Sequence, residues 1–253
     1  MAEENRKQAI LSELRARFRS EPRLGPHFHF DSLDWDETGT LILGGEVPSV
    51  AAKKRALECA ASHPAVNAIL DRVHVAPATA MGDAEIRAHL REFFTREPAF
   101  AGYAIRQQAS FAAPAGASPD LELVAGDPAA APSQIDIEIS AAVVTLGGRV
   151  PSLTAKRLAG VMAWWVPGVR DVVNGLEVEP EEEDSPIRIE EAVRLVLERD
   201  PFLDAGQVRV GVRRRTVHLT GAVRSAALRD MAERDAWCVF GVDDVLNEIE
   251  LLR

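Results

Sequence analysis

The sequence predicts an α+β protein built from three copies of one αββαβ unit, each a three-stranded sheet packed against two helices. One self-similar stretch begins, without internal gaps, at Leu43, Leu146 and Leu219. A repeat of this kind indicates tandem structural units. An amphipathic segment precedes each copy and stops at an acidic residue followed by proline, at Glu21-Pro22, Glu97-Pro98 and Asp200-Pro201. Because a residue before proline is pushed out of the α region, each unit is expected to open with a helix that ends there.

The first helix is predicted over residues 4–19, where Ile10, Leu11, Leu14 and Phe18 are spaced like one helical face. Two strands follow in each unit. In the middle unit, isoleucines at 135, 137 and 139 alternate with acidic residues, and in the third unit valines occupy 208, 210 and 212. This period of two is typical of a half-buried strand. A short turn then leads into the second strand, so each pair is expected to form a β-hairpin.

A second helix follows the hairpin, and Ser49, Ser152 and Ser225 are placed to cap it. The last strands are predicted over residues 66–75, 169–178 and 242–251. If the second and third strands are parallel, the helix between them is a crossover of the kind that is right-handed. The expected boundaries are 1–76, 82–179 and 185–253.

Two segments depart from the repeat. The middle unit has a surplus at about residues 101–133, rich in alanine and proline, which we interpret as a long extra hairpin, a bland extension or a disordered arm. The acidic stretch at residues 179–184 is interpreted as a solvated linker between the middle and third units. A shorter linker at residues 76–82 separates the first two.

Composition narrows the functional classes. The chain has 253 residues, a formal net charge of −10 and a pI of about 5.2, which argues against a chain-wide nucleic-acid surface. Two cysteines imply no disulfide framework. The charged, amphipathic N-terminus does not resemble a secretory signal, and no run of 18 apolar residues occurs. A soluble, cytoplasmic protein is therefore expected.

No catalytic or metal constellation is evident. His27 and His29 form an H-x-H pair, but zinc requires three or four ligands and nothing nearby is spaced to complete the set. There is no nucleophile elbow. The glycine pairs Gly44-Gly45 and Gly147-Gly148 lie inside predicted strands rather than at a phosphate-binding turn. The sequence thus predicts no enzyme, no catalytic residue, no metal and no cofactor.

The repeat resembles the BON domain, the bacterial OsmY and nodulation domain, in three tandem copies. The middle copy carries the pattern at Leu146, Gly148, Val150, Ser152, Ala159, Gly168, Val169, Val172, Asn174, Leu176 and Val178. The third copy matches it at Leu219, Gly221, Val223, Ser225, Ala232, Gly241, Val242, Val245, Asn247 and Ile249. The first matches at Leu43, Gly45, Val47, Ser49 and Ala56, and departs from it at Ala65.

Most of the shared residues have a structural interpretation. The glycine of Leu-x-Gly-x-Val is expected to let a strand approach the helix layer, or to form a bulge. The glycine before the final valine is expected to take a positive φ at a helix C-terminus. The resemblance implies no catalytic residues. It implies association with the bacterial envelope or stress response, and binding to phospholipid surfaces, sugars or other partners. Many members of the BON family are periplasmic.

Residues that differ between copies are the candidates for ligand or partner contacts. Trp164 lies off the apolar stripe of its predicted helix, Trp237 is its repeat equivalent, and Trp165 is adjacent. Their packing between units or subunits is the alternative to an exposed ligand site. Arg213, Arg214 and Arg215 occupy the predicted hairpin turn of the third unit, with Arg209 nearby, and could meet anionic lipid or form a solvated turn. The basic runs at 53–55 and 156–157 are predicted to form a polar helix face.

The leading hypothesis is a non-enzymatic binding or scaffolding protein, stress- or envelope-associated, that recognises a partner protein, a lipid surface or a small ligand. One alternative is peripheral association with anionic phospholipid membranes through the basic hairpin tips. Another is a purely structural homo-oligomer. A protein partner or self-association is expected, with anionic lipid as a second possibility and no nucleic acid.

Overall fold

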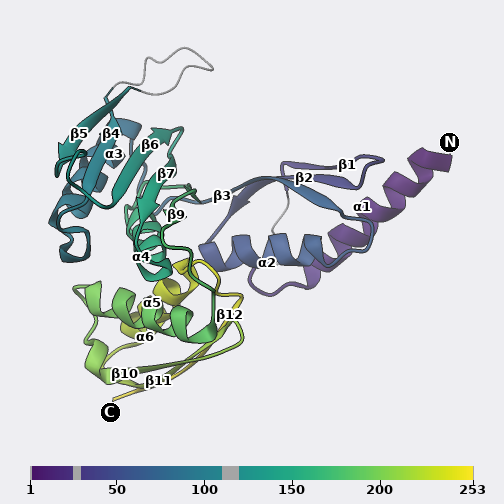
Figure 1. Cartoon of the computed structure of the whole chain (residues 1–253). Coiled ribbons are helices and arrows are strands. Elements are labelled where there is room, and N and C mark those ends of the chain that lie inside the picture. The colour runs from purple at the N-terminus through teal and green to yellow at the C-terminus, as the bar shows by residue number, and fades with distance from the viewer. Residues whose placement is uncertain (1, 25–29, 110–119, 253) are drawn as a thin grey trace. The chain divides into compact units, whose positions relative to one another are not determined.

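The computed structural model describes residues 2–24, 30–109 and 120–252, which divide into two compact bodies, Met1–Ala76 and Pro77–Arg253. The predicted α+β class with three αββαβ units is confirmed (Figure 1). The first unit forms the N-terminal body, and the middle and third units share the C-terminal body. No helix among the described residues is long and apolar enough to cross a membrane. His27, His29 and residues 110–119 of the predicted arm lie outside the described residues.

The N-terminal body follows the predicted order. Its elements are α1 (Ala2–Ser20), β1 (Ser32–Trp35), β2 (Thr40–Val47), α2 (Val50–Ala61) and β3 (Ala68–Val75). β1 pairs antiparallel with β2, and β2 pairs parallel with β3. The predicted apolar face of α1 is buried at Ile10, Leu11, Leu14 and Phe18. Helix α2 buries Ala52, Ala56 and Ala60, so both helices of this unit contribute side chains to one small core.

The middle unit has a larger sheet than expected. It begins with α3 (Asp83–Arg96) and the short helix η1 (Pro98–Phe100). Its strands are β4 (Ala104–Gln108), β5 (Leu121–Ala125), β6 (Gln134–Ser140), β7 (Val143–Val150), β8 (Asp171–Asn174) and β9 (Glu177–Val178), with α4 (Leu153–Trp164) after β7. The described part of the predicted arm contributes β4 and β5 as an antiparallel pair, and β4 lies parallel to β6. The surplus sequence thus extends the sheet by two strands.

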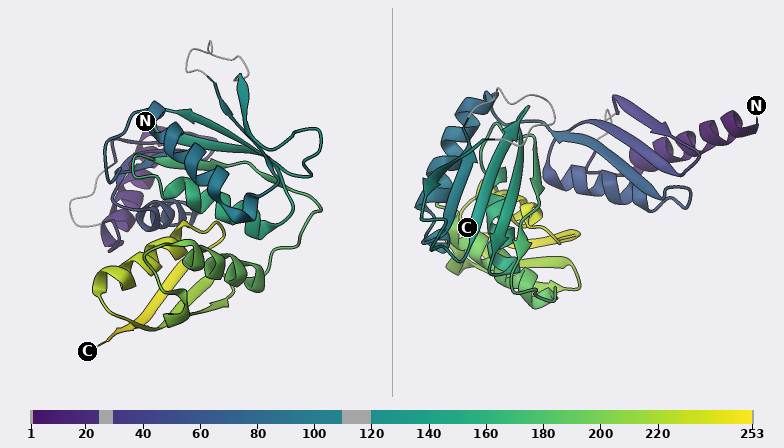
Figure 2. Two further views of the ribbon diagram at one scale, coloured as in Figure 1. Left: turned by 90° about the vertical axis from the view of Figure 1, so that its left-hand side faces the viewer. Right: turned by 45° about the horizontal axis from the view of Figure 1, so that its top comes forward.

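The third unit returns to the three-stranded form. It comprises α5 (Pro186–Arg199), η2 (Ala205–Gln207), β10 (Val208–Arg213), β11 (Thr216–Val223), α6 (Ala226–Cys238) and β12 (Asp244–Leu251). Within the C-terminal body α4 packs against α5 and α6. The helical layers of the middle and third units therefore face each other, and the opposite face of each sheet is left open (Figures 1 and 2).

Local hydrogen bonds explain the recurring helix boundaries. The carboxylates of Glu21, Glu97 and Asp200 accept the backbone N–H two residues further on, over 3.2, 2.9 and 2.8 Å. The acidic residue before each proline therefore fixes the turn that follows the helix. The predicted serine caps are confirmed, because each hydroxyl accepts the N–H three residues on, over 3.2 Å at Ser49, 3.1 Å at Ser152 and 3.3 Å at Ser225.

Candidate functional site

The repeated asparagine of the motif joins the last strand to the second helix. Asn174 Nδ2 donates to the Lys156 carbonyl over 2.7 Å, and Asn247 Nδ2 donates to the Arg229 carbonyl over 3.0 Å. The first unit has Asp71 at this position, and its carboxylate pairs with the buried Lys53 ammonium over 3.0 Å. Lys53 Nζ also donates to the Val73 carbonyl over 2.7 Å. This part of the motif therefore holds the fold together and presents no ligand site.

The strand glycines of the motif, Gly148 and Gly221, have a different role from the one expected. Gly148 and Gly221 adopt φ values of 102° and 124°. A Cβ at Gly148 would lie 2.3 Å from the carbonyl oxygen of Gln134, the first residue of β6, and one at Gly221 would lie 2.0 Å from that of Gln207, directly before β10. The close approach is thus between two strands, and not between a strand and the helix layer. Gly241 has the predicted positive φ of 90°, whereas a Cβ at Gly168 would instead meet Met81 Cβ at 2.5 Å.

A buried guanidinium ties the middle unit to the third. Arg157 on α4 is fully buried. Its Nε donates to the Phe240 carbonyl over 2.8 Å, and its Nη2 pairs with Asp184 over 2.8 Å. Its Nη1 is buried without a hydrogen-bond partner among the described residues. The prediction of a polar helix face is wrong for Arg157 and for Lys53, because both lie beneath packed elements.

Trp165 makes a second polar contact between the middle and third units. Its indole N–H donates to Asp235 Oδ1 on α6 over 2.8 Å. Burial raises the pKa of the Asp235 carboxyl to about 8, the nearby Asp200 carboxyl acts in the same direction, and the Trp165 hydrogen bond acts against it. A buried carboxyl in such a setting holds its proton at neutral pH, since the charged form would lose its hydration. The contact between the middle and third units, called the junction below, therefore contains a neutral carboxylic acid.

Further ties come from the helix ends and the linker. Arg199 Nε on α5 donates to Glu97 Oε1 over 2.8 Å. The predicted solvated linker is only partly free, because Glu182 Oε2 accepts the Leu153 N–H at the start of α4 over 2.8 Å. Asp184, also in the linker, is the partner of Arg157. The middle and third units therefore form one body joined by charged and polar side chains.

The predicted contact residues separate into three groups, which are buried or half-buried tryptophans, the paired Arg215, and three exposed arginines. Trp237 is 1% exposed, so its ring is not part of an open surface, and Trp164 is half-buried. Arg215 Nε donates to the Gly241 carbonyl over 2.9 Å, and its guanidinium lies 3.8 Å from Asp184 and 3.7 Å from Asp243. The contacts of Arg215 are therefore structural contacts within the C-terminal body, and the Trp237 ring lies in its core.

Arg209, Arg213 and Arg214 are exposed, and within the described ranges none of them has an ion-pair partner. Arg214 occupies the predicted hairpin turn with a φ of 58°. Arg209 and Arg213 lie on β10 and point to the open side of its sheet, since Val208 and Val210 between and beside them are buried. These three arginines remain available to a partner.

The open sheet faces share a feature that sequence reasoning did not single out. The strand that follows the second helix of each unit (β3, β8 and β12) exposes a large apolar side chain at the same repeat position: Leu70 is 44% exposed, Val173 51% and Leu246 44%. All three lie on the face away from the helices. The signal is present in the aligned copies, where an apolar residue recurs directly before the position of Asp71, Asn174 and Asn247.

The BON domain profile matches residues 7–77, 122–180 and 188–253. The chain belongs to the BON domain family. The middle match begins inside β5, so α3 and β4 of this BON unit lie outside it. Among the described residues, no group of three or more His, Cys, Asp or Glu side chains is placed to hold a metal ion. The BON family supports a non-enzymatic binding or scaffolding role.

Two solved structures align with 96% of this BON chain. One is described as the C-terminal domain of CdsD, the structural protein of the type III secretion system of Chlamydia trachomatis, and the other comes from structural studies of CdsD. Each is 14% identical with a TM-score of 0.24, and the alignments cover 98% and 92% of those chains. No curated protein sequence gives a significant match.

Proposed function

We propose that this protein is a non-enzymatic scaffold that binds protein partners through the open faces of its BON sheets. The observation that carries the proposal is the recurrence of an exposed apolar side chain at Leu70, Val173 and Leu246. Single exposed apolar residues are common on protein surfaces. Three at one repeat position, on the face that no helix covers, are better explained by a shared contact surface.

The geometry of the C-terminal body supports a scaffold. The ties at Arg157, Trp165 and Arg199 hold the helical layers of two units together. Both sheets of this body therefore present their open faces outward from one rigid core. A pre-organised surface binds with less loss of conformational entropy than a mobile one.

Site-specific photocrosslinking in the source cells tests this proposal. A photoreactive residue is placed at Leu70, Val173 or Leu246, and at the exposed control positions Glu92 on α3 and Glu198 on α5. We expect discrete protein adducts from the three sheet positions and none from the two helix positions. Equal labelling at sheet and helix positions, or no protein adduct at any sheet position, would contradict the proposal.

A second candidate is binding to an anionic surface. It is favoured by the exposure of Arg209, Arg213 and Arg214 without ion-pair partners in the described part of the chain. It is opposed by acidic side chains on the same unit, because Asp243 is exposed beside the turn and Glu248 and Glu250 are exposed on β12. Flotation with vesicles rich in anionic phospholipid tests it, and binding that is lost in high salt would support it.

A further inference from the structure

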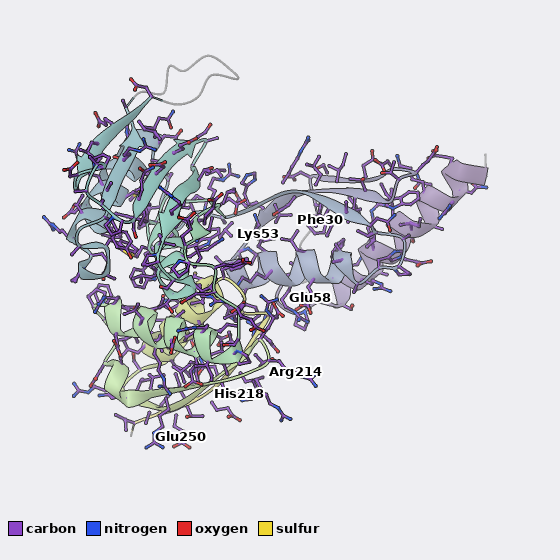
Figure 3. The ribbon with its side chains drawn as sticks, viewed as in Figure 1. Phe30, Lys53, Glu58, Arg214, His218 and Glu250 are labelled. Atoms are coloured by element: carbon purple, nitrogen blue, oxygen red, sulfur yellow. The ribbon has the colours of Figure 1, made fainter. Side chains whose placement is uncertain are left out.

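The open face of the third unit carries opposite charges on its two edge strands. Arg209 and Arg213 on β10 form one edge, and Asp244 and Glu248 on β12 form the other. Among the residues that the structure describes, none of these four has an ion-pair partner. His218 lies between the edges on β11, and Figure 3 shows it with Arg214 and Glu250 at this sheet. The face is therefore divided into a basic side and an acidic side.

The strand register places these side chains in three rows across the sheet. The first row is Arg213, Thr216 and Asp244, the second is Gly211, His218 and Leu246, and the third is Arg209, Thr220 and Glu248. Each charged row thus has arginine at one end and a carboxylate at the other. The middle row has Leu246 at one end and Gly211 at the other, where no described heavy atom lies within 4 Å of the position a Cβ would take.

We infer that this face binds the same face of a second copy of the chain. A two-fold axis that runs between the two faces, nearly parallel to the strands, places β10 of one copy over β12 of the other without changing the order of the rows. Arg209 then lies over Glu248 of the second copy, and Arg213 over Asp244. Leu246 lies over the open space at Gly211. Each contact occurs twice, as an isologous interface requires.

The opposite arrangement is unfavourable. A two-fold axis perpendicular to the strands would place β10 over β10 and bring arginines together. Like charges across an interface oppose association. Charge thus selects one of the two simple symmetric pairings, and two sheets packed this way resemble an aligned β-sandwich with faces about 10 Å apart.

The size of the face sets the expected affinity. Three strands about 4.8 Å apart and about 23 Å long give a contact at the low end of specific interfaces, below about 1,200 Å² in total. The dimer is therefore expected to be weak, with a dissociation constant on the order of tens of micromolar. Because exposed charge pairs are screened by salt, raising the ionic strength should weaken it further.

Charge reversal followed by mixing tests this inference. Arg209→Glu places two carboxylates together in each contact of its own homodimer, and Glu248→Arg places two arginines together. A heterodimer of the two variants has both contacts restored. By sedimentation velocity of the full chain at low salt, each variant alone should dimerise at least about tenfold more weakly than the wild type. An equimolar mixture should return to within about threefold of the wild-type dissociation constant.

Matched controls separate the face from the rest of the chain. Leu246→Ser should weaken the dimer, whereas Leu70→Ser at the equivalent position of the first unit should leave it unchanged, as should Glu198→Arg on α5. A wild-type chain that stays monomeric at several hundred micromolar, or a mixture that shows no recovery, would overturn the inference. The inference rests on the proposed function, but the two can fail separately. A monomeric chain that still forms adducts with another protein at Leu246 would overturn only the self-association.

Discussion

Replacing Asp235 with asparagine should stabilise the C-terminal body at neutral pH and remove a pH dependence. The wild-type carboxyl is buried, and its pKa is raised from 3.8 to about 8. An acid with a raised folded-state pKa binds more protons when folded, so its contribution is fully present below pH 3.8 and is lost as the pH rises toward 8. The expected slope is a loss of about 1.4 kcal/mol for each pH unit within that window.

The size of the effect follows from the same window. Between the acid limit and pH 7, the loss is on the order of 4 kcal/mol for the wild type. Asparagine has the shape of the protonated acid and its carbonyl can accept the Trp165 N–H, but it binds no proton. Asp235→Asn should therefore be more stable than the wild type by about 2–4 kcal/mol at pH 7, and nearly equal to it at pH 4.

Urea unfolding of both proteins at pH 4, 5, 6 and 7 measures the difference directly. Asp230→Asn is the matched control, because Asp230 lies on the same helix and is exposed. The control should show no comparable rise in relative stability with pH. The reasoning would be refuted if Asp235→Asn were less stable than the wild type at pH 7, since the carboxyl would then be ionised and favourably placed in the folded state.

Three further predictions concern the fold and the junction. Gly148→Ala should lower the free energy of unfolding by more than about 2 kcal/mol because the new Cβ would meet a carbonyl oxygen, whereas Gly147→Ala should lower it by well under about 1 kcal/mol. Urea unfolding at pH 7 compares the two variants, and equal losses would contradict this explanation. Ala142→Gly should gain about 1 kcal/mol, since Ala142 has a φ of 61° in the β6–β7 turn, and a loss in the same assay would count against that strain. Arg157→Ala should lower the free energy of unfolding by about 2–4 kcal/mol, and Lys156→Ala by less than about 1 kcal/mol. The same urea unfolding measures both, and similar losses would mean that the buried guanidinium contributes little to stability.

The sequence repeat was sufficient to predict the αββαβ core of each unit. Helix stops at acidic residues before proline, serine caps and strand alternation are all local patterns, and the structure has each of them where it was predicted. Local patterns carry this information because a helix boundary or a strand face depends on a few neighbouring residues. The two strands added to the middle sheet were harder to predict, since the surplus segment has no partner in the other copies.

The junction could not be predicted from periodicity. Trp164 and Trp237 occupy the same repeat position, yet Trp237 is buried and Trp164 is half-buried. Arg157 follows a helical pattern that reads as a polar face, but it is fully buried between two units. Periodicity within one helix reports which side faces its own sheet. It does not report what another unit places against the opposite side.

The recurring apolar position on the open sheets can be found in the sequence, but the sequence alone does not show that it lies on a binding surface. Leu70, Val173 and Leu246 align in the repeat, and each is followed in its strand by an aspartate or an asparagine. A single copy would suggest only an exposed residue of no consequence. The structure adds the fact that all three lie on uncovered faces, and that the face at Leu246 has complementary charges on its edges.

The central claim about the third unit is that its open sheet face binds the same face of a second copy of the chain. Amide chemical shifts of the full chain, followed as the protein concentration is raised at low salt, test it most directly. The account predicts that the amides of Gly211, His218 and Leu246 shift with concentration, while those of Ile189 and Val193 in the buried core of α5 do not. Shifts confined to the helices, or no shifts up to several hundred micromolar, would contradict self-association through this face.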